Sequence, residues 1–111
     1  MPYRVIATQT YKDEKKKWDK ADQIAAEKIE KKLAENPNVG DQCQYKFLRE
    51  KRVGGQRIYF LVYDDLDLVL LVATSGKKNQ QETINHIIEQ FDEFKELAQE
   101  IAKQLAPSDP F

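Results

Sequence analysis

Two adjacent glycines, Gly54 and Gly55, separate two strand-like runs and constrain the fold more than any other feature of this chain. A glycine pair in this setting predicts a hairpin with a two-residue turn, because glycine readily adopts the positive φ angles that such turns need. A turn of fixed length also fixes which residues face each other across the strands. The expected pairs are Val53 with Gln56, Arg52 with Arg57, Lys51 with Ile58, and Glu50 with Tyr59.

The expected pairing of Arg52 with Arg57 is unusual, because like charges directly opposite each other destabilise a strand pair. One interpretation is that the two arginines bind an external anion, for which a phosphate backbone is the obvious candidate. The other is that both arginines bridge internal carboxylates, either Glu50 or the acidic C-terminal segment. The sequence leaves both interpretations open.

The stretch from Gln44 to Gln81 predicts three consecutive antiparallel strands. By alternation, one face of the first two strands is the expected core face. That face carries Tyr45, Phe47, Val53, Ile58, Phe60 and Val62. The opposite face carries Lys46, Leu48, Glu50, Arg52, Arg57, Tyr59, Leu61 and Tyr63. Apart from Asp67, residues Leu66 to Ala73 are apolar without alternation, which is typical of a central strand covered on both faces.

Helices are expected on either side of these strands. A short strand, Tyr3–Thr8, precedes a polar helical stretch from Tyr11 to Glu35. Thr10 is the expected cap of this stretch, with Asp13 as its return partner. Asp19 or Asp22 could cap a second helix, so the stretch predicts either a helical hairpin or one bent helix.

The C-terminal segment predicts one long acidic helix over residues 79–106, capped by Asn79 with Glu82 in the capping-box position. Its apolar residues follow a heptad spacing: Ile84, Ile87, Phe91, Phe94, Ala98, Ile101 and Leu105. Such a seam usually packs on the chain's own sheet. Because this one is longer than a small sheet can cover, contact with a partner is the other expectation. The order of elements predicts a single α+β domain over residues 1–111.

Composition excludes several functional classes. The one cysteine, Cys43, allows neither an internal disulfide nor a thiolate zinc site, and His86 is the only histidine. No apolar run approaches the roughly 20 residues that span a bilayer, and no secretion signal is visible, so we expect a cytoplasmic protein. Residues 1–78 hold 16 basic and 12 acidic side chains, whereas residues 79–111 hold 2 and 7. A basic body therefore precedes an acidic end.

Four local stretches resemble the RelE/ParE toxin superfamily, particularly its archaeal RelE-like members. They are the strand MPYRVIAT, the Lys-rich helical pair ending in ENPNVG, the basic hairpin REKRVGGQRIYF, and the strand exit SGKKNQQ. The resemblance covers roughly residues 1–85. It implies a RelE-like fold with a four-stranded antiparallel sheet, an N-terminal helical hairpin and a long C-terminal helix.

The same resemblance implies the toxin of a type II toxin–antitoxin pair, which would be a ribosome-dependent mRNA endoribonuclease without metal or other cofactor. Its partners would be an antitoxin, the ribosome and mRNA. Position by position, Arg57 matches the arginine on the scissile phosphate and Lys78 matches the basic residue at the strand exit. Further RNA contacts are expected from Arg52, Lys77, Arg49 and Lys51.

The chain departs from the family pattern at two positions. Glu50 stands where the family can place a strand lysine, so it is either a general base or a neutralising partner of the arginines. Ile84 stands where some members have a tyrosine that stacks on the substrate, a role that Tyr59 could take instead. These departures favour an alternative: a catalytically inactive relative that binds an antitoxin, a second copy through the C-terminal helix, or a gyrase-type target.

Overall fold

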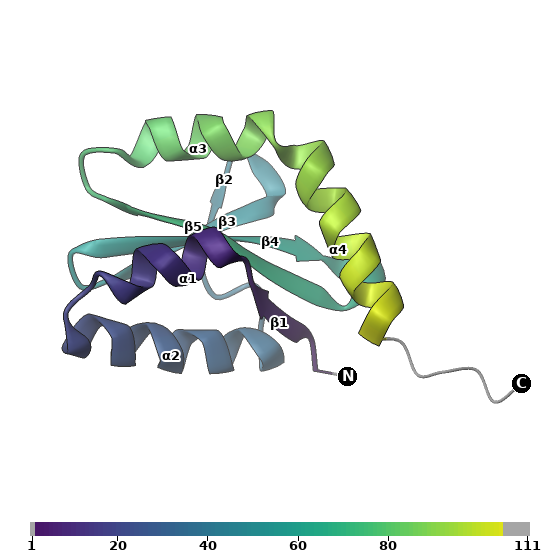
Figure 1. Ribbon diagram of the computed structural model, residues 1–111, viewed down its shortest axis with the longest axis horizontal. Helices are drawn as coiled ribbons and strands as arrows, with labels where there is room; N and C mark the ends of the chain where they lie inside the picture. The colour runs from purple at the N-terminus through teal and green to yellow at the C-terminus, as the bar shows by residue number, and fades with distance from the viewer. Residues whose placement is uncertain (1, 106–111) are drawn as a thin grey trace, which may run out of the picture.

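The computed structural model describes residues 2–105 of the chain. Within these residues, five strands form one mixed sheet in the order β1-β5-β4-β3-β2, and four α-helices pack on it (Figure 1). The strands are β1 (Arg4–Ala7), β2 (Asp41–Cys43), β3 (Tyr45–Val53), β4 (Gln56–Tyr63) and β5 (Leu68–Gly76). The helices are α1 (Gln9–Lys16), α2 (Lys20–Glu35), α3 (Gln80–Glu89) and α4 (Phe91–Leu105), with a 3₁₀ helix, η1 (Asp64–Leu66), between β4 and β5.

The expected α+β class is confirmed, but the expected four-stranded antiparallel sheet is wrong in two respects. β1 runs parallel to β5, with Ala7 opposite Leu71, and β2 adds a further strand beside β3 at the other edge. The sequence of a four-residue strand such as β1 does not indicate whether the strand pairs parallel or antiparallel. β2 has only three residues, too few for alternation to reveal a strand.

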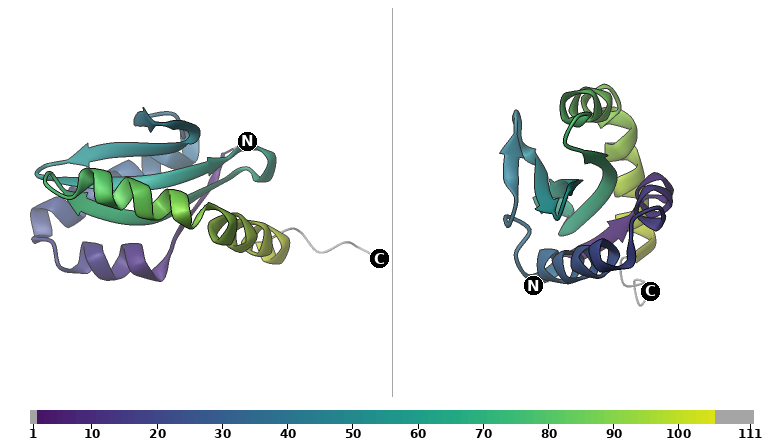
Figure 2. Two further views of the ribbon diagram at one scale, coloured as in Figure 1. Left: turned by 90° about the horizontal axis from the view of Figure 1, so that it is seen from above. Right: turned by 90° about the vertical axis from the view of Figure 1, so that its left-hand side faces the viewer.

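The expectation of a central third strand is confirmed, because β5 lies between β1 and β4. Helices cover the sheet on both faces: α1 and α2 lie on one side, and α3 and α4 on the other (Figure 2). Where β1 ends, α1 completes the edge of β5, since Glu14 Oε1 accepts a hydrogen bond of 2.9 Å from the backbone N–H of Thr74. A side chain thus replaces the missing strand partner.

The core consists of two clusters, one on each face of the sheet. The cluster under α1 and α2 contains Tyr11, Ala26, Leu33, Val53, Ile58, Phe60, Val62, Val69 and Leu71. The cluster under α3 and α4 contains Cys43, Leu48, Tyr59, Leu61, Leu70, Val72, Ile84 and Ile87. The strand face opposite the expected core face is therefore a second core face, with Leu48, Tyr59 and Leu61 fully buried. The apolar seam of the C-terminal helices packs on this second core face.

The expected core positions of Tyr45 and Phe47 are also corrected. The exposed fraction of Tyr45 is 42%, and Phe47 packs against the cluster under α3 and α4 instead of the one under α2. The pairing of β3 with β4 begins only at Leu48, opposite Leu61. The alternation that places side chains inside a paired ladder therefore does not extend to the first residues of β3.

The N-terminal helices form a hairpin, as one of the two expectations held. Asp19 caps α2, because its Oδ1 accepts from the backbone N–H of Asp22 at 3.1 Å. The cap of α1 is Thr8 and not Thr10: Thr8 Oγ1 accepts from the backbone N–H of Tyr11 at 3.3 Å. Thr8 is the last residue with extended backbone, which is the conformation a cap requires.

The single long helix expected over residues 79–106 is wrong, because α3 and α4 are separate helices that meet at Gln90. Asn79 precedes α3 but makes no side-chain capping bond, and Ala106 lies outside the described residues. An unbroken helix of this length would measure about 40 Å, whereas the nine residues of β5 span about 30 Å. The break lets Phe94 and Ile101 of α4 stay on the apolar cluster.

In the part of the chain that the structure describes, no helix has both the length and the apolar character needed to cross a membrane.

Candidate functional site

The hairpin between β3 and β4 has the expected turn and register. All four pairs are confirmed: Val53–Gln56, Arg52–Arg57, Lys51–Ile58 and Glu50–Tyr59. Gly54 adopts φ +59°, the left-handed region that side chains disfavour. A Cβ atom at Gly54 would also lie 2.6 Å from Asp22 Oδ1, so α2 presses on the turn. The backbone conformation therefore favours glycine here, and a larger residue would also require the Asp22 side chain to move.

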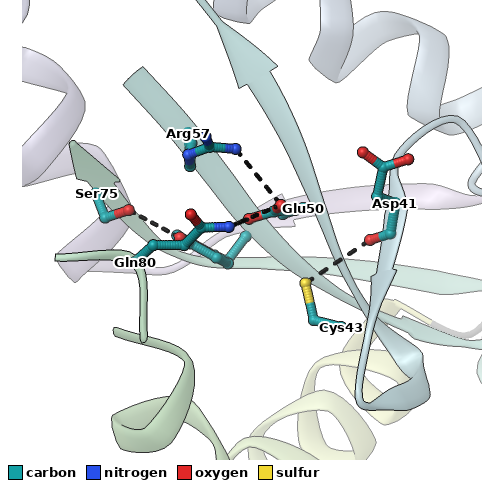
Figure 3. Close-up of polar contacts among 7 residues, drawn as sticks. Asp41, Cys43, Glu50, Arg57, Ser75 and Gln80 are labelled. Carbon is teal, nitrogen blue, oxygen red and sulfur yellow. Dashed lines mark hydrogen bonds and ion pairs between the residues drawn. The ribbon is translucent and has the colours of Figure 1, made fainter. Parts of the chain in front are cut away.

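Glu50 is the centre of a polar group on the α3 side of the hairpin. Its carboxylate is nearly buried, with a residue exposure of 9%. Arg57 Nη1 lies 3.5 Å from Glu50 Oε1, and Gln80 Nε2 donates to Oε1 and Oε2 at 3.1 and 3.0 Å (Figure 3). The internal interpretation is thus correct for Arg57. Among the described residues Arg52 has no ion pair.

Two cavities flank this group, and both arginines line both of them. A cavity of about 160 Å³ lies between the turn and Lys77, and we call it the hairpin cavity. It is lined by Arg52, Gly54, Gly55, Gln56, Arg57 and Lys77. A neighbouring cavity of about 480 Å³ is lined by Val39, Gly40, Asp41, Lys51, Arg52 and Arg57. The hairpin cavity therefore presents three cations and no carboxylate, which suits an anion.

Of the expected site residues, Arg52, Arg57 and Lys77 line the hairpin cavity, and Lys51 lines only the neighbouring one. Lys78 is exposed in the loop after β5 and lines neither cavity. Arg49 is turned to the loop before β2, where its Nη2 donates to the carbonyl oxygens of Asn38 and Gly40 at 3.2 and 2.8 Å. The same loop packs closely on β3, because a Cβ at Gly40 would lie 2.4 Å from the carbonyl oxygen of Glu50. The RNA contacts of Arg49 and Lys78 stay predictions.

Two titratable side chains near Glu50, Tyr59 and Cys43, have raised pKa values because they are buried. Tyr59 is fully buried, so it packs in the core and offers no surface on which a base could stack. Its hydroxyl lies 2.8 Å from Ser75 Oγ, and burial raises its pKa. Burial, followed by the charges of Glu50 and Asp41, raises the pKa of the Cys43 thiol to about 11. Cys43 is accordingly a neutral, unreactive thiol at physiological pH.

Gln80 was missed by the sequence analysis, although its amide makes the two hydrogen bonds of the group that are close to 3.0 Å. It is the first residue of α3. Nothing in the sequence distinguishes it from Gln81, whose amide instead bonds Asn85 within the same helix. Only the angle at which α3 leaves the sheet decides which of the two faces Glu50.

Comparison with known proteins adds structural relatives at low sequence identity. The sequence matches no protein-family model and no curated protein. Among solved structures, a mutant of the Escherichia coli toxin RelE in the free state matches with a TM-score of 0.68 at 17% identity, over 81% of this chain and 98% of that one. A chain of the Mycobacterium tuberculosis toxin–antitoxin complex RelBE2 matches with a TM-score of 0.61 at 20% identity, over 69% and 100%.

An archaeal structure also matches. A chain of the RelE–RelB complex from Pyrococcus horikoshii has a TM-score of 0.60 at 16% identity, covering 69% of this chain and 97% of that one. Each relative is covered almost completely by this chain. The chain has the fold of the RelE toxins.

Proposed function

We propose that this protein is the toxin of a type II toxin–antitoxin pair and cleaves mRNA on the ribosome. The observation that carries the proposal is the contact between the nearly buried Glu50 carboxylate and Arg57, which lines a cavity together with Arg52 and Lys77. A base and a cluster of cations at one point of a RelE fold are what transesterification of RNA requires.

In the proposed reaction, the Glu50 carboxylate takes the proton of a ribose 2′-hydroxyl. The 2′ oxygen then attacks the adjacent phosphorus, and the bond to the 5′ oxygen breaks, which leaves a 2′,3′-cyclic phosphate. Arg57 offsets the negative charge that develops on the phosphoryl oxygens, as preorganised donors do in other enzymes. We assign the proton for the leaving 5′ oxygen to the ammonium group of Lys78.

The remaining cations position the strand. Arg52 and Lys77, at the mouth of the hairpin cavity, are assigned to the flanking phosphates, with Lys51 beside the larger cavity. Phosphate contacts of this kind supply affinity and register without sequence preference. Arg57 alternates between Glu50 and the substrate: the ion pair of 3.5 Å is long enough that a phosphate can compete for the guanidinium.

The proposal includes an antitoxin as protein partner, since two of the structural relatives come from toxin–antitoxin complexes. Action on translated mRNA puts the protein in the cytoplasm. The archaeal RelE-like subtype is part of the same proposal.

A second candidate function is binding without catalysis. It is favoured by the neutralisation of Arg57, because the guanidinium pairs with a Glu50 carboxylate that Gln80 also holds in place. In this case the protein acts through an antitoxin, a second copy joined by the C-terminal helices, or a gyrase-type target. The group around Glu50 then has only a structural role.

Induced expression in a bacterial host tests both functions, with growth recorded and cleavage of a reporter mRNA mapped by primer extension. The proposal expects growth arrest and new 5′ ends only in the reporter that is translated. Arg57→Gln should abolish both, while Arg4→Gln, an exposed arginine on the edge strand β1, should leave both unchanged. Arrest without new 5′ ends, or normal growth with folded protein, would overturn the nuclease and support binding without catalysis.

A further inference from the structure

A further cavity lies at the other end of the sheet from the hairpin. It has a volume of about 550 Å³ and is formed by β3, the end of β4, η1 and the start of α4. Tyr63, at this end of β4, is six residues along the strand from Arg57, a separation of about 20 Å. In Figure 1 this region lies where α4 descends beside β4. We call it the α4 cavity.

Aromatic side chains make the apolar wall of the α4 cavity. Phe47, Tyr63 and Phe91 line it. The rings of Phe47 and Phe91 have centroids 4.9 Å apart, and Tyr45 meets Phe91 edge-on at 5.0 Å and 87°. These contacts fix the wall in position, and Tyr45, with an exposed fraction of 42%, extends it onto the surface. Aromatic faces of this kind attract cations.

Carboxylates also line the α4 cavity. Asp64 and Asp65 come from η1, and Asp92 from the first turn of α4. Among the described residues none of the three forms an ion pair, although Lys95 also lines the cavity. Asp64 accepts a hydrogen bond of 2.7 Å from the Tyr3 hydroxyl, which leaves its charge in place. The cavity therefore carries more negative than positive charge.

Two tyrosines near these carboxylates, Tyr63 and Tyr3, have raised pKa values. Burial, assisted by the charge of Asp65, raises the pKa of Tyr63 to about 12. The hydrogen bond to Asp64 is the largest cause of the raised pKa of Tyr3. Within residues 2–105, however, no group of three or more carboxylate, histidine or cysteine side chains converges closely enough for a metal ion. The charge suits a larger, diffuse cation.

We propose that the α4 cavity binds an arginine side chain presented by a partner protein in a short segment that also carries apolar residues. The guanidinium would stack on Phe91 or Phe47 and pair with Asp65 and Asp92, combining cation–π attraction with charge-assisted hydrogen bonds. A volume of about 550 Å³ holds more than one guanidinium group, and the exposed ring of Tyr45 beside it offers a surface for a neighbouring apolar residue. Nucleic acid is excluded here because its phosphates would be repelled.

The inference goes beyond the nuclease and does not depend on it, because the α4 cavity shares no lining residue with the hairpin cavity. Taken singly, each of the three aspartates has a structural explanation. Asp92 lies in the first turn of α4, where a negative charge is favourable, and Asp64 and Asp65 lie in the turn formed by η1. Neither explanation accounts for the three aromatic side chains that line the same cavity as these carboxylates. That combination is the basis of the proposal.

The test uses the full chain and two synthetic peptides, acetyl-Ala-Leu-Arg-Leu-Ala-amide and the same peptide with citrulline in place of arginine. Citrulline keeps the shape of arginine and removes its charge. Binding is followed by NMR, through the ring resonances of Phe47, Tyr63 and Phe91. The arginine peptide should shift these resonances and bind about tenfold more tightly than the citrulline peptide. Added salt should reduce the difference.

Matched variants and a small cation complete the experiment. The double variant Asp65→Asn with Asp92→Asn should bind the arginine peptide only as weakly as the citrulline peptide. Glu96→Gln with Glu100→Gln, two exposed residues of α4 outside the cavity, should leave binding unchanged. Asp65→Asn alone, in an exposed turn, keeps the test valid if the double variant does not fold. Equal binding of the two peptides would overturn the proposal, and so would binding of agmatine as tight as that of the arginine peptide.

Discussion

The side-chain amide of Gln80 donates to both carboxylate oxygens of Glu50, and so the first residue of α3 is joined to the middle of β3. Arg57 approaches the same carboxylate from the neighbouring strand. Three elements therefore meet at one nearly buried charge, and the geometry of the candidate site depends on all of them. Gln80 and Arg57 thus hold the Glu50 carboxylate in place before any substrate arrives, and such preorganisation favours electrostatic catalysis.

The substitution Glu50→Gln separates binding from chemistry. Loss of a general base should lower mRNA cleavage by roughly 10²- to 10⁴-fold. Affinity for a non-cleavable oligonucleotide with a 2′-deoxy scissile position should rise, because Arg57 loses its internal anion. Fluorescence anisotropy and primer extension measure the two effects, with Glu35→Gln, exposed at the end of α2, as the control. Undiminished cleavage would move the base to another residue.

Replacement of the two paired arginines should give different results. Arg57→Gln leaves the nearly buried Glu50 without its cation, and should cost about 1–3 kcal/mol of unfolding free energy as well as RNA affinity. Arg52→Gln removes an exposed side chain, and should reduce RNA affinity with little loss of stability. Urea denaturation and oligonucleotide binding, measured on both variants, distinguish the two roles. Equal stability losses would contradict the assignment.

The buried hydroxyl pair behind the site should contribute to stability. Tyr59→Phe removes one partner of the 2.8 Å contact with Ser75 and leaves the nearly buried Ser75 hydroxyl unsatisfied. We expect a loss of about 1–2 kcal/mol in unfolding free energy. The matched change Tyr45→Phe removes a hydroxyl from a ring that is 42% exposed, and should have almost no effect. A thermal melt that does not distinguish the variants would show that Ser75 finds another partner.

The two glycines of the turn should differ in their tolerance of alanine. Gly54→Ala places a Cβ in the left-handed region and 2.6 Å from Asp22 Oδ1, so it should destabilise the fold by about 1–2 kcal/mol or more. Gly55→Ala meets nothing within 4 Å and should be nearly neutral. Chemical denaturation of both variants gives the comparison. An equal effect at the two positions would mean that the turn rearranges.

The pH dependence of Cys43 alkylation should differ between the folded and the unfolded protein. Its pKa is raised from 9.0 to about 11, so the folded state keeps the proton that the unfolded chain has lost between these values. The contribution of this thiol to stability is thus present below about pH 9 and is lost as the pH rises towards 11. Alkylation by iodoacetamide should follow a midpoint near pH 11 in the native protein and near 9 in urea. Coinciding profiles would show that the thiol is solvated in the fold.

The hairpin could be predicted from the sequence in detail because a two-residue turn leaves no freedom of register. From Gly54 and Gly55 alone, the pairing of Glu50 with Tyr59 follows four steps away, and it is confirmed. The central position of β5 was likewise legible in its unbroken apolar run. Local rules suffice where local geometry decides.

The parts that could not be predicted depend on distant contacts. Leu48 and Leu61 lie on the same strand face as Glu50, and only the arrival of α3 and α4 decides that this face is buried. The break at Gln90 follows from the length of the sheet, and the heptad spacing contains no information about that length. For the candidate site, Glu50 and Arg57 were identified with two open interpretations, whereas Gln80 depended on the path of α3.

The parallel pairing of β1 with β5 has a consequence for how the protein is made. Ala7 is synthesised early, but Leu71, its neighbour in the sheet, follows 64 residues later. A nascent chain that has reached the β3–β4 hairpin holds a first strand without the strand it belongs beside. Closing so long a loop is entropically expensive and slow compared with local hairpin formation. The docking of β1 is therefore expected as the last, rate-limiting step, and a truncated translation product would leave Val5 and Ile6 uncovered.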